Sequence, residues 1–509
     1  MAKRKRDNHA EDAGAKAQKA ATTQNVHKTA PTLSNPALAA PLQIITGSYE
    51  RVLHGLTATL GAKLDSNASQ RDSNAVKFTD TFLFNAHASA IRCIAISPPS
   101  DSSDPKSQKV ILASGSTDER INLYQLSTAP PPANSQPSIP TLTGTPITHN
   151  PKNREMGSLM HHSSNIGALH FPSRSKLFSG ADDNTIAITR TRDWTVLSSI
   201  KAPIPKAQGR PSGDTAGPGE IPSGINDFAV HPSQKLMISV SKGEKCMRLW
   251  NVMTGKKASV LNFDREILQN VGEGKWSSGE GRKVKWSPDG EEWVVVFERG
   301  FVVYGLDSRP KSQTLPRPMT KIHQVHYVPG LSEDIGEILA VSTEDGRILF
   351  YSTKETVTPE AASKAVKSGT EAAVPSCKLI AQLGGKSAGL NGRVKDFEIL
   401  PIPEEADQYY IITGSSDGAV RIWRLSQSEL TLPAEDAANK GQDDKDSEKV
   451  ATVSNTLSAK QVGELIGTHE TGNRITCLKA FIMNGTPEDD GDTPMEQDEA
   501  SSSDNSDSE

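Results

Sequence analysis

The segment that most resembles an enzyme's active site is the run Gly414-Ser415-Ser416-Asp417-Gly418. Its letters fit Gly-x-Ser-x-Gly, the pattern in which a serine nucleophile lies on a sharp turn between a strand and a helix. Here the run is followed by alternating apolar residues up to Trp423, which is typical of a strand. The pattern therefore favours a tight turn between two strands. We assign no catalytic residue and predict that the chain is not an enzyme.

Residues that could hold a metal or a cofactor are scattered. The four cysteines lack the Cys-x-x-Cys spacing of a zinc or redox site. The adjacent His161-His162 could hold a stray metal ion, but the pair stands before a strand pattern, and a structural hydrogen-bonding pair is the favoured interpretation. Gly384-Gly385-Lys386-Ser387 lacks the earlier glycine of a phosphate-binding loop, since Ile380 stands there. We predict no metal site and no cofactor.

The element that contains the glycine-flanked serine recurs along the chain. Ile411 and Ile412 begin a strand, Ser416-Asp417-Gly418 supplies a turn, and a second strand leads to Trp423. Variants of this phrase, each after a short apolar strand, begin near residues 112, 178, 238, 293 and 340. In a WD repeat the turn aspartate accepts backbone hydrogen bonds that lock the turn. We therefore expect structural roles in the blade turns for six residues: Asp118, Asp182, Asp345, Asp417, Trp250 and Trp423.

Six complete units can be counted, and two leftover pieces complement each other. Residues 44–56 resemble a second and a third strand, and residues 474–481 resemble a first strand. Joined, they make a seventh blade that both ends of the chain share, which removes the unpaired edges of an open ring. The sequence therefore predicts an all-β fold with almost no helix, a seven-bladed WD-repeat β-propeller over residues 42–483.

Segments outside the repeat are expected to be disordered. They are residues 1–41, residues 484–509, and loop insertions rich in Pro, Ser, Ala, Lys and Asp at residues 129–150, 203–221, 354–376 and 426–460. No apolar run reaches the roughly 18 residues that a membrane span needs, and the basic N-terminus lacks the apolar segment of a secretory signal. Because the cysteines also behave as buried apolar residues, we expect a soluble protein of a reducing, intracellular compartment with no membrane contact.

Four phrases together resemble one family. They are residues 45–55, the pair His161-His162, residues 177–183, and residues 392–396 ahead of the 414–418 turn. From about residue 42 to residue 481 the chain is similar to the Mak-eleven and Pak-kinase-interacting family of WD-repeat proteins. Members of that family end in a Lys-rich tail, whereas this chain ends in an acidic one, so tail functions cannot be carried over.

The resemblance implies a function and its alternative. The function is that of a non-catalytic scaffold in nucleolar maturation of the large (60S) ribosomal subunit and in rRNA processing. The implied partners are pre-ribosomal large-subunit particles and a ribosomal-protein-like assembly factor, with precursor rRNA as a further candidate. The alternative is a signalling adaptor that binds and negatively regulates a Pak-type protein kinase. Both functions need only a binding surface, so the fold alone cannot decide between them.

Clusters of cations supply the candidate binding residues. The chain has a net charge of −5, but residues 484–509 carry ten acidic side chains and no Lys or Arg, so the rest is net positive. A basic body suits contact with RNA or an acidic protein surface. The candidates flank the first strands of two blades, where a solvated strand face is the alternative: Arg282, Lys283, Lys285, Arg393 and Lys395. Whether the two groups share a face is left open.

The chain ends carry two further candidates. Lys3, Arg4, Lys5 and Arg6 form a candidate nuclear localisation signal, with a solvated terminus as the alternative. Ser501 and Ser506 lie among acidic residues and are candidate phosphorylation sites, with a solubilising tail as the alternative. Together with the family resemblance, the basic N-terminus predicts a location in the nucleus and the nucleolus.

Overall fold

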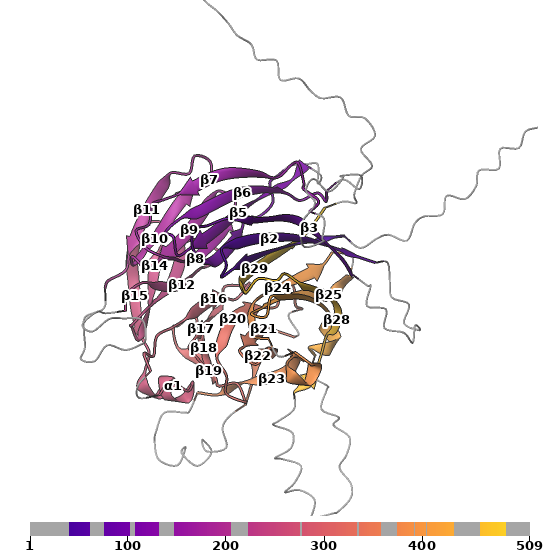
Figure 1. The fold of residues 1–509 in the computed structure, drawn as a ribbon. Coiled ribbons are helices and arrows are strands. Elements are labelled where there is room, and N and C mark those ends of the chain that lie inside the picture. The colour runs from indigo at the N-terminus through magenta and orange to yellow at the C-terminus, as the bar shows by residue number, and fades with distance from the viewer. Residues whose placement is uncertain are drawn as a thin grey trace, which may run out of the picture. The chain divides into compact units, whose positions relative to one another are not determined.

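A ring of seven antiparallel sheets makes up the described part of the chain (Figure 1). The computed structural model describes residues 40–61, 76–101, 107–131, 147–204, 222–274, 277–332, 335–357, 374–390, 392–403, 405–431 and 459–484. Within these ranges there is one α-helix, α1 (Arg265–Asn270), and two short 3-10 helices, η3 (Lys386–Ala388) and η4 (Gln427–Glu429). The prediction of a seven-bladed β-propeller with almost no helix is confirmed.

Each sheet is one blade, named A to G in the order in which the blades follow one another around the ring. Blade A contains β29 (Ile475–Ile482), β1 (Leu42–Ser48), β2 (Val52–Leu60) and β3 (Val76–Asn85). Blade B contains β4 (Ile91–Ile96), β5 (Lys109–Ser116), β6 (Ile121–Ser127) and β7 (Arg154–Leu159). Blade C contains β8 (Ile166–Ser173), β9 (Lys176–Ala181), β10 (Thr185–Arg190) and β11 (Val196–Lys201). Blade D contains β12 (Ile225–Val230), β13 (Leu236–Ser241), β14 (Cys246–Asn251) and β15 (Lys256–Asn262).

The remaining three blades repeat this order. Blade E contains β16 (Lys283–Trp286), β17 (Glu292–Val296), β18 (Phe301–Gly305) and β19 (Pro310–Thr314). Blade F contains β20 (Ile322–Tyr327), β21 (Ile338–Thr343), β22 (Arg347–Val357) and β23 (Ser376–Gly384), with the short β27 (Lys460–Gln461) added in parallel to β23. Blade G contains β24 (Val394–Ile402), β25 (Glu405–Ser415), β26 (Ala419–Ser426) and β28 (Glu464–Glu470). In every blade the first strand given is the inner one.

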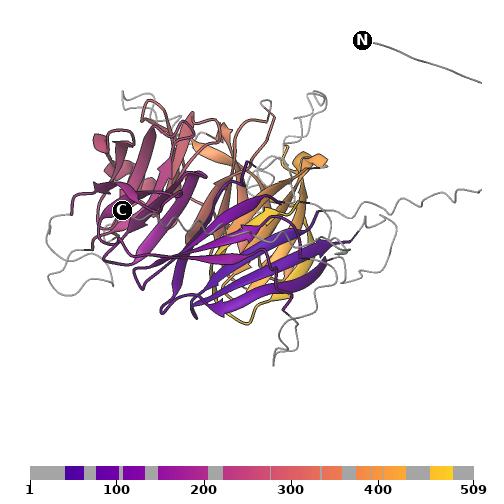
Figure 2. The ribbon, with the colours of Figure 1, turned by 90° about the horizontal axis from the view of Figure 1, so that it is seen from above.

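The two ends of the described chain meet in blade A. β29 pairs antiparallel with β1, so that Leu42 lies opposite Ile482 and Thr46 lies opposite Leu478. Figure 1 and Figure 2 both show the yellow C-terminal strands beside the indigo N-terminal ones. This pairing gives the inner strand of blade A a partner and leaves no open seam between first and last blades. The predicted seventh blade, shared by both ends, is confirmed.

Apolar side chains between neighbouring blades hold the ring together. Seven buried clusters occur in the described residues, one at each junction between two blades. At the junction of blades G and A, for example, Ile44 and Leu56 pack with Ile412 and Val420, and all four side chains have no exposed surface. Burying one such aliphatic side chain is worth about 1.5–3 kcal/mol. Because each blade is covered on both faces, its central strands are nearly continuous apolar runs.

In six of the seven blades, a bulge at the start of the inner strand redirects one residue. The register shifts by one residue in six of the seven inner strands, which leaves one unpaired residue in each: Arg92, Gly167, Asn226, His323, Lys395 and Thr476. A bulge residue has no partner opposite it, and its side chain is redirected relative to the regular pleat. All six residues line the central cavity of the ring.

The loop insertions are shorter than predicted where the chain is described. β22 continues to Val357 and pairs with β23, so residues 354–357 belong to a strand and not to a loop. Asn150 is buried and donates from its Nδ2 to the Ala129 carbonyl oxygen, which ties together the ends of the first insertion. The physical reason is strand pairing, which continues past the change in composition. The remaining centres of the insertions, residues 1–39 and residues 485–509 lie outside the described residues.

Candidate partner-binding site at the channel mouth

The inner strands surround a central cavity of about 1490 Å³. We call the end at which the inner strands begin its mouth. In six of the seven blades, a backbone hydrogen bond there ties the residue before the inner strand to the turn between the second and third strands. In blade G the amide of Ser416 donates to the carbonyl oxygen of Arg393 at 2.9 Å, and in blade F the amide of Glu344 donates to that of Lys321 at 2.8 Å. In blade A the amide of Tyr49 donates to the carbonyl oxygen of Arg474 at 2.9 Å.

Three consecutive blades therefore present a cation at the same position. Lys321, Arg393 and Arg474 precede the inner strands of blades F, G and A, whereas small or neutral residues precede those of blades B, C and D. Lys395, at the bulge of blade G, and Arg282, just before the inner strand of blade E, also line the cavity. We call these five cations the basic crescent: Arg282, Lys321, Arg393, Lys395 and Arg474.

The positive charge of the basic crescent affects the pKa of the neighbouring His323. Burial lowers the pKa of His323 most, Lys395, Lys321, Arg393 and Arg282 contribute in that order, and together they bring it to about 3. The Nζ of Lys395 lies 3.5 Å from Nε2 of His323. The pKa of Lys395 is itself lowered, first by burial and then by Arg393 and Arg474. The cations are thus close enough to repel one another, and an anion bound at the mouth would relieve that repulsion.

Carboxylates in the neighbouring turns neutralise part of this charge. Glu298 lies 3.5 Å from the guanidinium of Arg282 and 3.7 Å from the ammonium of Lys321. Glu344 lies 3.2 Å from Nε of Arg393. These side chains are a third to a half exposed, and exposed ion pairs contribute only about 0–1 kcal/mol. The cations can therefore exchange such partners for the phosphates or carboxylates of a bound molecule at little cost.

Further inside the cavity the charges are more nearly balanced. Lys479 forms an ion pair with Glu398, and Lys283 lies 3.9 Å from Asp227. Burial lowers the pKa of Lys285, and Lys479 lowers it further. Asp396 accepts a hydrogen bond from the Leu478 amide at 2.9 Å. The charged side chains inside the cavity are therefore engaged with one another. The basic crescent at the mouth is the part that a partner can reach.

The five cations expected to bind a partner all lie at or beside this cavity. Arg282, Lys283, Lys285 and Lys395 line it, and Arg393 adjoins Lys395. The two groups therefore come together on one side of the ring, although Lys283 and Lys285 lie on its inside and not on a solvated face. Sequence reasoning missed Lys321 and Arg474. Aligning the residue before each inner strand would have found both.

The blade-turn residues form matching networks in blades B and C. The carboxylate of Asp118 lies 3.0 Å from Nδ1 of His87, whose Nε2 lies 2.8 Å from the Ser114 hydroxyl. The carboxylate of Asp183 lies 3.0 Å from Nδ1 of His162, whose Nε2 lies 2.8 Å from the Ser179 hydroxyl. The other histidine of the adjacent pair, His161, has its Nε2 3.1 Å from that same hydroxyl. These histidines therefore join the strands of one blade.

In blade C the turn aspartate is Asp183, and the prediction of Asp182 for this role is wrong. Asp183, and not Asp182, accepts the hydrogen bond from the amide two residues ahead, that of Thr185, at 2.9 Å. Asp182 instead pairs with the ammonium of Lys242 in blade D at 2.6 Å. The strand pairing explains the shift, since Gly180 and Gly414 occupy equivalent positions and the turn aspartate follows each by three residues.

The other assigned turn residues lie where the repeat places them. Asp417 accepts from the Ala419 amide at 3.0 Å, and Gly418 beside it has φ +90°, a left-handed conformation that glycine adopts readily. Asp345 bonds the Thr343 hydroxyl and accepts from Nε of Arg347 at 2.7 Å. The indole of Trp250 donates to the Ser239 hydroxyl at 2.8 Å. Trp423 is buried in the junction of blades F and G.

Two of the predicted sites fall outside the described residues. These are the candidate localisation signal, Lys3 to Arg6, and the candidate phosphorylation sites, Ser501 and Ser506. In the described part, all four cysteines are free thiols, and three of them are buried. No helix found there is long and apolar enough to cross a membrane.

Comparison with known proteins gives the following matches. Residues 78–125 and 153–189 match the WD40 family, described as WD domain, G-beta repeat. The chain is 25% identical over 389 residues to the p21-activated protein kinase-interacting protein 1-like of Gallus gallus, covering 76% of this chain and 74% of the relative. It is 25% identical over 410 residues to Protein MAK11 of Saccharomyces cerevisiae, covering 76% and 78%. It is 23% identical over 385 residues to Shk1 kinase-binding protein 15 of Schizosaccharomyces pombe, covering 75% and 77%.

Proposed function

This chain belongs to the WD-repeat family of the p21-activated protein kinase-interacting proteins and Protein MAK11, and from this membership we propose that it is a scaffold in maturation of the large ribosomal subunit. In this role it acts by binding and not by catalysis. It docks an assembly factor on precursor particles in the nucleolus. The WD40 fold supports this role because its rims and loops present binding surfaces without needing catalytic groups.

The basic crescent is the observation that carries the proposal. It gathers five cations from four neighbouring blades at one side of the channel mouth, against the turn carboxylates Glu298 and Glu344. Lys and Arg side chains that meet phosphates displace bound counterions, so binding through them depends steeply on salt. We propose that the crescent contacts the phosphate backbone of precursor rRNA or an acidic segment of a particle protein.

A basic, ribosomal-protein-like assembly factor needs a surface of opposite charge. The crescent would repel such a factor. Residues 484–509, with ten acidic side chains and no Lys or Arg, have the composition that suits it. We therefore propose a division of roles, in which the crescent holds the particle and the acidic C-terminal segment attracts the basic factor.

Gradient sedimentation tests the proposal. Tagged full-length chain is expected to co-sediment with large-subunit precursors. The double variant Arg393→Glu with Lys395→Glu should shift it towards free protein and reduce the dependence of binding on salt by about one unit of logarithmic slope per lost phosphate contact. The matched control is Lys256→Glu with Lys257→Glu, which makes the same charge change on the exposed outer strand β15 of blade D. Equal sedimentation of both double variants with precursors would contradict the proposed role of the crescent.

A signalling adaptor that binds and negatively regulates a Pak-type kinase is the second candidate, and the names of the relatives from Gallus gallus and Schizosaccharomyces pombe favour its kinase-binding part. The two candidates differ in the effect of depletion. Loss of a large-subunit scaffold lowers large subunits relative to small ones. If depletion leaves that ratio unchanged and raises Pak-type kinase activity, the signalling function replaces the ribosomal one.

A further inference from the structure

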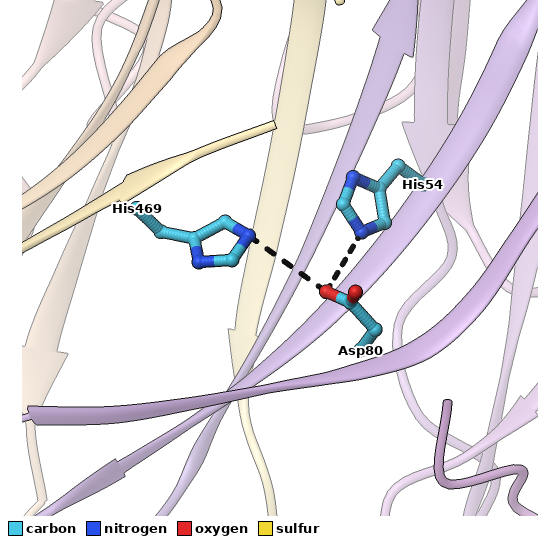
Figure 3. A group of neighbouring side chains, drawn as sticks. All are labelled: His54, Asp80 and His469. Atoms are coloured by element: carbon cyan, nitrogen blue, oxygen red, sulfur yellow. Dashed lines mark hydrogen bonds and ion pairs between the residues drawn. The ribbon is translucent and has the colours of Figure 1, made fainter. Parts of the chain in front are cut away.

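Three side chains from distant parts of the sequence meet where blades A and G pack together (Figure 3). His54 belongs to β2, Asp80 to β3 and His469 to β28. In the described part of the chain, this is the one group of three or more His, Cys, Asp or Glu residues whose ligand atoms all lie within 4.8 Å of one another. Two imidazoles and one carboxylate are a ligand set that suits a divalent transition metal.

The distances between the ligand atoms fit a single ion. Nε2 of His54 lies 3.0 Å from Oδ1 of Asp80, and Nε2 of His469 lies 3.7 Å from the same oxygen. Zinc bonds to nitrogen and oxygen are about 2.0–2.2 Å long, and in tetrahedral geometry they place neighbouring ligand atoms about 3.4 Å apart. The two observed separations bracket that value. An ion can therefore be accommodated by small rotations of these side chains.

Comparison with the structural histidines of blades B and C shows what is unusual here. His87 and His162 each use both ring nitrogens, one towards an aspartate and the other towards a serine. His54 has only the aspartate, because its buried Nδ1 has no hydrogen-bond partner. The carboxylate differs as well, because Nε2 of a second imidazole, that of His469, lies 3.7 Å from the oxygen of Asp80 that His54 contacts, a distance too long for a hydrogen bond.

The three side chains differ in their exposure to solvent. His54 and Asp80 are only 4% and 6% exposed. His469 is partly buried, and its ring lies 5.2 Å from that of Phe78. The partly exposed side of His469 leaves a path by which an ion can enter.

We propose that His54, Asp80 and His469 bind a zinc ion at the junction of blades A and G. Three protein ligands leave a fourth position for water. The ion would join the outermost strand of blade G to two strands of blade A, next to the junction where the chain closes the ring. Its role would therefore be to stabilise ring closure, because a ligand that binds only the folded state raises stability by mass action.

Titration of metal-free, full-length protein with Zn²⁺ tests the proposal. The metal is first removed with a chelator, and binding is then followed by calorimetry and by metal analysis after gel filtration. We expect one tight equivalent per chain and a higher unfolding temperature of the zinc-loaded protein. Replacing zinc by Co²⁺ should give the intense visible absorption of a tetrahedral site.

Variants identify the ligands. His469→Gln, at the most exposed of the three positions, should weaken zinc binding by more than the roughly 10- to 100-fold that loss of an outer-shell partner costs. Asp80→Asn should also weaken it. The matched control is His161→Ala, which removes one member of the adjacent histidine pair in blade C and should bind zinc as the wild type does. Circular dichroism checks the fold of each variant.

Two results would overturn the proposal. One is the absence of a stoichiometric zinc ion in the wild-type protein, which is measured independently of any variant. The other is a bound equivalent that His469→Gln retains with the affinity of the wild type, whatever the result for His161→Ala. Neither result bears on the basic crescent, so failure here leaves the proposed scaffold function to its own test.

Discussion

Two pairs of neighbouring blades have the same four-stranded fold but are stabilised by different contacts. One pair is blades B and C, and the other is blades D and E. In blades B and C, a histidine joins the turn aspartate to a serine of the second strand. Blade D retains only the bond from Trp250 to Ser239, and its turn contains an ion pair of Arg248 with Glu244. Residues matched by the WD40 family model include the polar networks of blades B and C and none of blades D and E.

Aromatic packing takes the place of the polar network at the junction of blades D and E. The rings of Trp286 and Trp293 are 4.9 Å apart, and Trp293 stacks on Tyr304 at 5.9 Å. Phe263 meets Phe297 edge to face at 5.0 Å. Such pairs contribute about 0.5–1.5 kcal/mol beyond the burial of their surface. A blade therefore needs a filled junction with its neighbours, and the polar network is one way among others to fix its turn.

The largest effect is expected from emptying the aromatic junction. Trp293→Ala removes a side chain that is 4% exposed and contacts aromatic residues on both sides. It should lower the free energy of unfolding by about 3–5 kcal/mol. Denaturant unfolding measures the loss. If the free energy of unfolding fell by less than about 1 kcal/mol, the aromatic junction would not be the main stabilising contact between blades D and E.

A smaller loss is expected from breaking a polar network. Asp183→Ala removes the partner of His162 Nδ1 and of the Thr185 amide, which leaves buried donors unsatisfied. The expected cost is about 1–3 kcal/mol. The same unfolding assay measures it. If Asp183→Ala cost as much as Trp293→Ala, the two means of fixing a blade would be equivalent in strength.

The two regions should also differ in their response to acid. Burial lowers the pKa of His87 in the folded state, although Asp118 opposes this effect. The unfolded chain therefore binds more protons below the ordinary histidine pKa of about 6.5, and the stability that depends on neutral His87 is full above that pH and is lost as the pH falls. His87→Gln should flatten the decline in stability below about pH 6.5. Ser239→Ala in blade D removes no titrating group and should leave that slope unchanged.

The smallest effect is expected at the neighbouring aspartate of blade C. Asp182→Ala removes an ion pair with Lys242 whose side chains are 18% and 33% exposed. Partly exposed pairs of this kind are worth about 0–1 kcal/mol. Compared with Asp183→Ala, this variant checks the corrected position of the turn. A larger loss for Asp182→Ala than for Asp183→Ala would restore the original assignment.

Local pattern was sufficient to predict the strands and their closure. The run from Ile411 to Trp423 forms β25, a turn and β26, as its alternation predicts. Residues 44–56 and 474–481 pair within blade A because each lacked the strands that the other supplies. Composition predicted the insertions less well, since backbone pairing continues through polar residues as far as Val357.

The candidate sites were predictable only in part. Arg393 and Lys395 stand out in the sequence as cations beside an apolar strand. Lys321 and Arg474 lie near them only because three blades follow one another around the ring. No local sequence pattern shows this proximity. The group of His54, Asp80 and His469 was missed entirely, because its members come from three strands of two blades.

The sequence by itself determined the period of the repeat, the strands, the turns and the number of blades, because alternation and turn residues act over a few neighbouring positions. Only the tertiary structure decided which side chains meet across blades. Closing the ring brings His469 to His54 and aligns the residues before the inner strands around one mouth. Those contacts depend on the order of blades around an axis and on a bulge that redirects one residue in six of the seven inner strands, and both are properties of the assembled ring.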